Sequence, residues 1–164
     1  MQNVYFASTD AIATLIIWAM TVLIKNPSVL RKVQAELRST LPTLQNKAMM
    51  EEEDIATAQL PYFNATIKET LRVYSTIPLL IPRETIKDCT IDGYEIPAKT
   101  LVHVNAWAIS KDPELWKDPF EFKPERFLGD ERKLTMDLKG TDFGLIPFGA
   151  GRRGCPGLQW RWPR

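Results

Sequence analysis

Cysteine and histidine are scarce in this sequence of 164 residues. It has 2 cysteines, Cys89 and Cys155, and 1 histidine, His103, and it contains no Cys-x-x-Cys pair. Small disulfide-stapled domains are much richer in cysteine, and a structural zinc site takes a full set of Cys and His ligands. The sequence therefore excludes a disulfide scaffold and makes a structural zinc site implausible. Reduced thiols of this kind are typical of a protein that faces the cytosol.

A strong excess of either charge is also missing. The sequence has 21 Lys and Arg residues against 20 Asp and Glu residues, which gives a formal net charge of +1. Proteins that bind nucleic acid normally carry a basic patch or a basic tail. We therefore expect no nucleic-acid partner.

The longest apolar stretch covers residues 11–24, in which threonines are the sole interruptions. An apolar run of this length is more often a buried core helix than a membrane span. Extended back to Val4 it would be long enough to cross a membrane, but Asp10 would then lie inside the apolar segment, which is costly. No basic segment precedes the run, so we expect no secretory signal. A helix that is apolar on all sides belongs in the centre of a protein, and we expect these residues to be a piece of a longer chain.

Prolines predict where the next helices begin. Pro27 starts a helix predicted to end at about Leu41, and Pro61 starts another. The first of these is expected to have a solvated face formed by its charged residues, Arg31, Lys32, Glu36 and Arg38. Residues 84–106 alternate as strands do, with a hairpin turn predicted at Asp92-Gly93. Most of the 12 prolines follow position 60, which argues against a helical bundle in the C-terminal half.

The stretch from Phe148 to Gly157 has the most distinctive composition in the chain. It reads Phe-Gly-Ala-Gly-Arg-Arg-Gly-Cys-Pro-Gly, and its glycines permit positive φ and close approach of a large flat ligand. Backbone N–H groups directed at Cys155 would favour a thiolate, the form that binds a metal. Residues 149–154 also fit the pattern G-x-G-x-x-G. Only residues 155–164 follow, however, which leaves no room for the helix and acidic residue of a dinucleotide site. A glycine-rich surface turn with an inert cysteine is the other alternative.

The pattern Phe-x-x-Gly-x-Arg-x-Cys-x-Gly is met at every specified position of this stretch. It resembles the haem-binding loop of the cytochrome P450 family, in which the cysteine is the proximal iron ligand. The resemblance implies that the Cys155 thiolate ligates the iron of haem b and donates electron density that favours O–O cleavage. Arg153 and Arg83 would hold the haem propionates, because a guanidinium suits a carboxylate. The further cofactor-binding residues implied by the resemblance are Phe148, Gly149, Gly151 and Gly157.

Two further motifs upstream support the resemblance. Glu69 and Arg72 form a Glu-x-x-Arg pair within the helix that begins at Pro61, where residues three apart share one side. Pro124-Glu125-Arg126-Phe127 follows at the family's spacing. By resemblance, Arg126 completes a buried Glu–Arg–Arg cluster that braces the haem loop. Without the motif at residues 124–127, Glu69 and Arg72 would be interpreted as an ordinary surface ion pair.

The segment Ala7-Ser8-Thr9-Asp10-Ala11 resembles the oxygen-binding part of the family's long central helix. The family pattern has glycine where this chain has Ser8 and threonine where it has Ala11. By resemblance, Asp10 and Thr9 would handle protons, although alanine lacks the hydroxyl that the family uses. Taken alone, these residues would be a polar turn of a core helix. The substrate-pocket residues implied by the resemblance are Ala7, Ala11, Ile77, Leu79 and Leu80.

The resemblance implies a mainly α fold with small β-sheets, corresponding to the C-terminal part of the cytochrome P450 fold. This part comprises the central helix, the Glu-x-x-Arg helix, a small sheet, an irregular meander and the haem loop. We expect residues 1–164 to form a partial single domain, truncated at both ends. The tail after Leu158, Gln-Trp-Arg-Trp-Pro-Arg, cannot supply the long final helix of the family.

The function implied by the resemblance, which is closest to plant-type microsomal members, is that of a haem-thiolate monooxygenase. It would insert one oxygen atom of O2 into an apolar small molecule, in plant specialised metabolism. Electrons would come from NADPH through a cytochrome P450 reductase, at the cytosolic face of the endoplasmic reticulum membrane. Two alternatives stay open. One is a haem-thiolate isomerase or dehydratase that needs no O2, which Ala11 favours, and the other is a non-catalytic truncated fragment.

Overall fold

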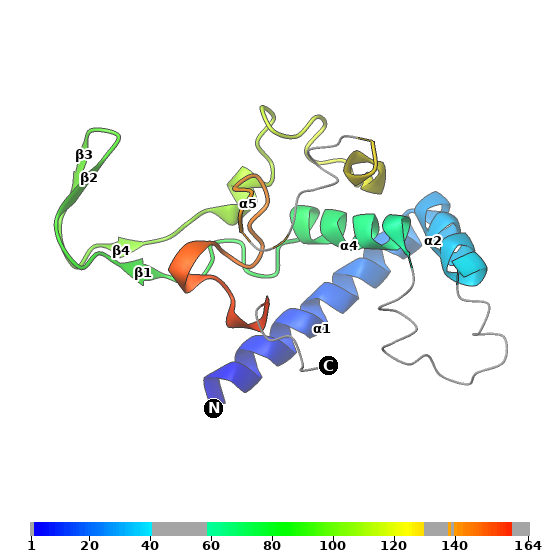
Figure 1. Cartoon of the computed structure of the whole chain (residues 1–164), viewed down its shortest axis with the longest axis horizontal. Helices are drawn as coiled ribbons and strands as arrows, with labels where there is room; N and C mark the ends of the chain where they lie inside the picture. Colours follow the sequence, from blue (N-terminus) through cyan, green and yellow to red (C-terminus); the bar gives the residue numbers. More distant parts are fainter. Residues whose placement is uncertain (1, 41–58, 130–137, 139, 159–164) are drawn as a thin grey trace. The chain divides into compact units, whose positions relative to one another are not determined.

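The computed structural model describes residues 2–40, 59–129, 138 and 140–158. The chain divides into two compact units, each built from two separate segments (Figure 1). The first unit contains Met1–Tyr74 and Phe120–Met136, and the second contains Ser75–Pro119 and Asp137–Arg164. The tail after Leu158 lies outside the described residues. The single partial domain expected from the sequence therefore stays a prediction.

The first unit is helical (Figure 1). Its elements are the helices α1 (Gln2–Lys25), α2 (Pro27–Thr40) and α4 (Pro61–Val73) and the 3-10 helix η2 (Pro124–Phe127). Proline opens three of these elements because its fixed φ suits a first helical position, where no N–H is needed. At the end of α1, the Asn26 side chain and backbone N–H both donate to the carbonyl of Val22. The predicted helix starts at Pro27 and Pro61 are confirmed.

Helix α4 is the centre of this unit because it contacts α1, α2 and η2. The Trp18 ring on α1 stacks on Tyr74, the residue after α4, with centroids 4.2 Å apart and planes 14° apart. Such offset aromatic pairs stabilise beyond the area that they bury. The apolar core of the unit contains Val22, Val29, Val33, Leu60, Ala65, Leu71 and Phe127.

The outer side of α1 is apolar and exposed, whereas the sequence predicts a helix buried at the centre of a longer chain. The exposed side chains include Ile12, Ile16, Ile17, Met20 and Ile24. Over Ala7–Lys25 the helix has a mean hydropathy of 1.8, and only 6% of this stretch is buried. By length and composition it could cross a membrane, a property that core helices of soluble proteins share.

The second unit contains two small antiparallel sheets (Figure 1). Strand β1 (Arg83–Glu84) pairs with β4 (Leu101–Val102), and β2 (Cys89–Ile91) pairs with β3 (Tyr94–Ile96). Asp92 and Gly93 join β2 to β3 with φ values of 50° and 83°. Positive φ at both central residues is the geometry of a tight hairpin turn, so the predicted turn is confirmed.

The sequence predicts strands over residues 84–106, but the last strand, β4, ends at Val102. The chain then enters the short helix α5 (Ala106–Ile109), whose first turn is capped by the Asn105 side chain accepting from the N–H of Ala108. The remaining elements are the 3-10 helices η3 (Gly151–Arg153) and η4 (Pro156–Leu158). The mainly helical fold with small sheets is confirmed.

We predict that the exposed apolar side of α1 makes the isolated chain self-associate in dilute buffer, since a large exposed apolar patch favours association. Replacing two of its exposed residues, Ile16→Glu with Ile24→Glu, should shift the chain toward the monomer in analytical ultracentrifugation. Lys25→Glu, a charge change at an exposed polar position of the same helix, should not. A monomeric wild-type chain with a cooperative thermal melt would contradict this prediction.

Candidate functional site

A buried charged cluster lies at the centre of the first unit. Glu69 and Arg72, on adjacent turns of α4, are both 0% exposed. Arg72 binds the carboxylate with two hydrogen bonds, from Nε to Oε2 at 2.7 Å and from Nη2 to Oε1 at 2.8 Å. Arg126 of η2 donates from its Nε to Glu69 Oε1 at 2.9 Å, and the backbone N–H of Lys123 donates to the same oxygen at 2.9 Å. The structure thus brings together the three residues that the sequence predicts to form one cluster.

The cluster contains two guanidinium groups and one carboxylate. Its excess positive charge faces a backbone carbonyl, because Arg72 Nη2 and Arg126 Nη2 each donate to the Glu121 carbonyl oxygen at 3.1 Å. A buried ion pair is tolerated only when its charges are fully hydrogen-bonded, which these contacts provide. Since Lys123 and Arg126 belong to a segment about 50 residues away from Glu69, the cluster ties η2 to α4.

The cysteine lies in a tight loop of the second unit. Gly149 and Gly151 have φ values of 72° and 67°, which favour glycine over any other residue. The backbone N–H of Cys155 donates to the Phe148 carbonyl at 2.9 Å, which closes the loop, and the N–H of Gly154 donates to the Gly151 carbonyl at 3.0 Å. The Cys155 residue is half-buried. This arrangement holds one thiol on a compact glycine-rich turn.

Arg83 lies beside this loop. A Cβ atom added at Gly149 would lie 3.8 Å from Arg83 Nη2 and 3.8 Å from Leu80 Cδ1. The pairing of β1 with β4 sets Arg83 opposite Val102 and so holds its backbone in place. A fixed guanidinium next to the cysteine loop can bind a carboxylate group of a ligand.

Gly140 supports the same loop, and the sequence analysis did not identify it. It has a φ of 77°, and a Cβ atom there would lie 2.4 Å from the Gly149 carbonyl oxygen and 2.9 Å from Ala150 Cα. No side chain other than hydrogen fits in this space. A lone glycine in an irregular stretch gave no signal, because the contact depends on tertiary folding that brings Gly140 against the loop.

The predicted proton-handling and pocket residues are divided between the units. Ala7, Thr9 and Asp10 are exposed on α1 in the first unit, and Ala11 is half-buried there. In the second unit Ile77 is half-buried and Leu79 is 47% exposed. Each unit therefore presents its own part of the predicted site.

Leu80 differs from these pocket residues. Its side chain is buried against Ala106 and Ile146, in the apolar core of the second unit. Its φ is 52°, a left-handed conformation that is unfavourable for a bulky residue and is held by this packing. The burial of Leu80 makes Leu79 the better candidate for contact with a ligand.

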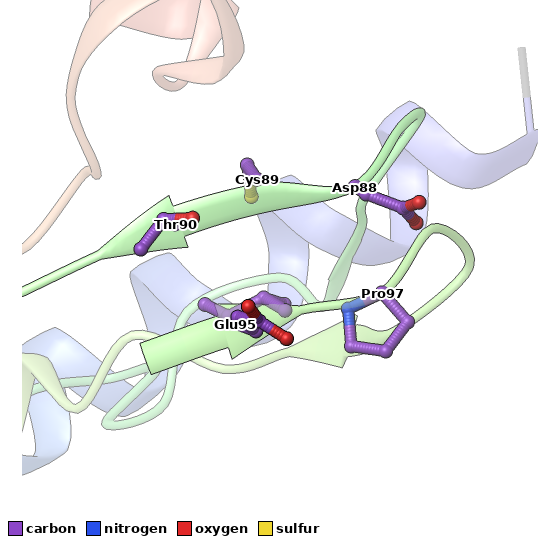
Figure 2. Close-up of a pocket in the computed structure, with 6 residues that line it drawn as sticks. Asp88, Cys89, Thr90, Glu95 and Pro97 are labelled. Carbon is purple, nitrogen blue, oxygen red and sulfur yellow. The ribbon is translucent and has the colours of Figure 1, made fainter. Parts of the chain in front are cut away.

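A separate hollow lies along the β2–β3 hairpin (Figure 2). Its volume is about 410 Å³, and it is lined by Asp88, Cys89, Thr90, Glu95, Ile96 and Pro97. None of the predicted site residues lines it. Within the part of the chain that the structure describes, no three His, Cys, Asp or Glu side chains come together as metal ligands.

The cysteine loop and Arg83 fit a haem group. Cys155 offers one half-buried thiol, and a cysteine thiolate is a known ligand of haem iron. The glycines leave the backbone open to a flat group, and Arg83 supplies a cation for its carboxylates. A glycine-rich cysteine loop and a buried Glu–Arg–Arg cluster together indicate the haem-thiolate class of protein.

The chain belongs to the cytochrome P450 family. The family model described as Cytochrome P450 matches residues 1–159. Among curated relatives, the chain is 48% identical to "Cytochrome P450 71B3" of Arabidopsis thaliana over 160 residues, which cover 98% of this chain and 30% of the relative. It is 50% identical to "Cytochrome P450 71A1" of Persea americana over 158 residues, which cover 96% of this chain and 30% of that relative. Membership of the family implies a haem-thiolate cofactor.

Solved structures agree with this assignment. A zebra fish cytochrome P450 structure with progesterone matches with a TM-score of 0.76 and 31% identity, over 93% of this chain and 32% of that chain. A second, with abiraterone, matches with a TM-score of 0.75 and 31% identity, over 93% of this chain and 34% of that one. The chain thus spans about a third of the length of the proteins that it matches.

We predict that Glu69→Ala destabilises the chain by about 3–5 kcal/mol, because it leaves two guanidinium groups without their carboxylate. Urea titration followed by helical circular dichroism measures the change in the free energy of unfolding. Glu95→Ala, at an exposed position of the hairpin, should change it by less than about 0.5 kcal/mol. Equal effects of the two substitutions would contradict the role of Glu69.

We also predict that Gly140→Ala opens the cysteine loop. The added methyl group would clash with the Gly149 carbonyl, so the Cys155 thiol should react with a thiol reagent about tenfold faster. Cys89 in the same chain is the internal reference and should keep its rate. Gly93→Ala is the matched control, since Gly93 has a φ of 83° but no atom within 4 Å of an added Cβ. An unchanged Cys155 rate in Gly140→Ala would contradict this contact.

Proposed function

We propose that this chain is part of a haem-thiolate monooxygenase that acts on an apolar small molecule in plant specialised metabolism. The observation that carries the proposal is the compact loop that contains Cys155 and has Arg83 beside its Gly149, in a chain of the cytochrome P450 family. When bound, haem b would supply the redox chemistry that inserts one atom of O2 into the substrate and releases the other as water, with two electrons from NADPH and two protons.

The residues of the second unit would bind this group. The Cys155 thiolate would ligate iron, since the loop closed by its N–H to the Phe148 carbonyl holds the sulfur in one place. Arg83 and Arg153 would bind the propionates, and the half-buried Phe148 ring would pack near the macrocycle. Gly149, Gly151 and Gly157 would keep the loop surface free of side chains. The cluster of Glu69, Arg72 and Arg126 would act as a structural brace rather than in the reaction.

Protons would be handled on α1. Asp10 is exposed, and Thr9 is the adjacent hydroxyl. Ala11 stands where the family has threonine, so this chain lacks the hydroxyl that normally lies one residue after the acid. That difference favours a second candidate function, an isomerase or dehydratase of the same haem-thiolate class that consumes no O2.

The substrate would be apolar because the side chains proposed to contact it are apolar. The side chains of Ala7, Ala11, Ile77, Leu79 and Leu80 carry no hydrogen-bonding group. One relative, 46% identical over 160 residues that cover 98% of this chain and 31% of that protein, is named "3-beta-hydroxylase" in Tanacetum parthenium. Its name supports oxygen insertion into a small molecule.

The proposed partners are O2, an NADPH-dependent cytochrome P450 reductase and the small-molecule substrate, with no nucleic acid. The proposed location is the cytosolic face of the endoplasmic reticulum membrane. Because the chain covers about 30% of its curated relatives, the activity is proposed for a longer protein of which residues 1–164 form a partial domain. A non-catalytic fragment is a further alternative, favoured by the exposed apolar side of α1.

The test is the ferrous–CO absorption spectrum of the chain expressed with haem supplied. We expect a red-shifted thiolate Soret band in the wild type and in Cys89→Ser, and loss of the red shift in Cys155→Ser, which removes the thiolate. Consumption of NADPH and O2 during turnover separates the monooxygenase from the isomerase or dehydratase. Absence of haem uptake in the wild type would favour the non-catalytic fragment. An unchanged band in Cys155→Ser would contradict the proposed ligand.

A further inference from the structure

Helix α2 holds the first turn of α4 through Glu36. The Glu36 carboxylate accepts the backbone N–H of Tyr62 at 2.8 Å through Oε1 and that of Phe63 at 2.7 Å through Oε2. These N–H groups belong to the first turn of α4, where no helical carbonyl can pair with them. Leu60, the residue before α4, has no side-chain hydrogen bond that caps the helix. A carboxylate from α2 therefore caps α4, and it also suits the positive end of the helix dipole.

One turn earlier on α2, Lys32 reaches η2. Its Nζ lies 2.6 Å from Glu125 Oε1, and the Tyr62 hydroxyl donates to the same oxygen at 2.9 Å. The Lys32 ammonium also lies 5.5 Å from the centre of the Tyr62 ring. Glu125 is thus bound at once by a residue of α2 and a residue of α4. The sequence placed Lys32 and Glu36 on a solvated face. Lys32 is exposed as expected and Glu36 is half-buried, and both side chains also bind neighbouring elements.

The ionisation of Glu125 and Tyr62 agrees with the hydrogen bond between them. Burial alone would raise the pKa of Glu125, but hydrogen bonds from Lys32, the backbone and Tyr62 outweigh burial and lower the pKa. Burial and the bond to Glu125 raise the pKa of Tyr62. The pair is therefore a neutral phenol donating to a charged carboxylate, a charge-assisted bond that is stronger than a neutral one.

Glu125 is the neighbour of Arg126 in the four-residue helix η2 (Pro124–Phe127). Lys123, the residue before η2, makes no side-chain hydrogen bond that caps η2. The position of η2 therefore depends on its contacts with other elements. Arg126 contacts Glu69 on one side, and Glu125 contacts Tyr62 and Lys32 on the other. The contacts of Arg126 with Glu69 and of Glu125 with Tyr62 both hold η2 against α4.

We propose that Tyr62 and Glu125 are positioning residues that hold η2 so that the Arg126 guanidinium stays bound to Glu69, with Lys32 and Glu36 fixing the helices from which they act. The Lys32–Glu125 pair is partly exposed, with side-chain exposures of 56% and 38%, and contributes little alone. Of the two side chains that bind Glu125, we therefore expect the Tyr62 hydroxyl to contribute more. The contribution of this positioning to haem binding rests on the proposed function. The positioning of the Arg126 guanidinium against Glu69 does not.

The test uses the whole 164-residue chain, labelled with 15N-arginine and solubilised in mild detergent. In Tyr62→Phe, exchange of the Arg126 Nε–H with solvent should become about tenfold faster, the fold-change expected when a charge-assisted hydrogen bond is lost. The Arg72 Nε–H should keep its rate, because its bond to Glu69 lies within α4. Tyr94→Phe is the matched control, since Tyr94 is 75% exposed on the hairpin. An unchanged Arg126 rate in Tyr62→Phe would overturn the proposal.

Further variants separate positioning from general loss of structure. Glu125→Gln keeps an acceptor for Tyr62 and should raise the Arg126 exchange rate less than Glu125→Ala. Equal rates in these two variants would also overturn the proposal. If Tyr62→Phe loses helical circular dichroism, Lys32→Met removes only a partly exposed cation and should give an increase of about threefold. No increase in that variant would count against the proposal.

The ferrous–CO spectra of the same variants distinguish the two proposals. A faster Arg126 exchange without any thiolate Soret band in the wild type would support the positioning of Arg126 and favour the non-catalytic fragment. If the wild type shows the band and Tyr62→Phe loses part of its red shift, together with faster Arg126 exchange, both are supported. A thiolate Soret band in the wild type, with unchanged Arg126 exchange in Tyr62→Phe, would reject the positioning role of Tyr62 but not the proposed function.

Discussion

The first unit depends on the hydrogen bonds and ion pairs that the buried Glu69 carboxylate makes. A single oxygen, Oε1, accepts from Arg72, Arg126 and the backbone of Lys123, so one group joins α4 to η2. Two buried guanidinium groups without it would be strongly unfavourable, because desolvation of an unpaired charge costs several kcal/mol. The geometry at η2 therefore decides whether both guanidinium groups stay paired, and the contact of Glu125 with Tyr62 acts on that geometry.

The second unit depends on a different constraint, which is the close approach of backbone to backbone. The cysteine loop requires positive φ at Gly149 and Gly151, and the chain at Gly140 approaches it where no Cβ would fit. This packing leaves a rigid turn that presents one thiol, with the Arg83 guanidinium nearby. A charged network orders the first unit, whereas close backbone packing orders the cysteine loop of the second.

Local patterns predicted much of the fold. Helices begin at Pro27 and Pro61 because proline restricts φ locally, and the Asp92-Gly93 turn forms because both residues tolerate positive φ. The three-residue spacing of Glu69 and Arg72 likewise gave their pairing. The contacts of Glu36 were not predictable in this way, because its partners Tyr62 and Phe63 lie on another helix and a charged residue on an amphipathic helix normally faces solvent.

The sequence by itself determined the family-specific motifs, the helix starts, the hairpin turn and the single cysteine in a glycine-rich loop, because each depends on residues close together in the chain. Only the tertiary structure decided that Glu36 caps α4, that Gly140 supports the loop and that the Leu80 side chain packs against Ala106 and Ile146. These contacts join segments far apart in sequence. Their energies come from burial, charge pairing and steric fit, which exist only once the segments have packed together.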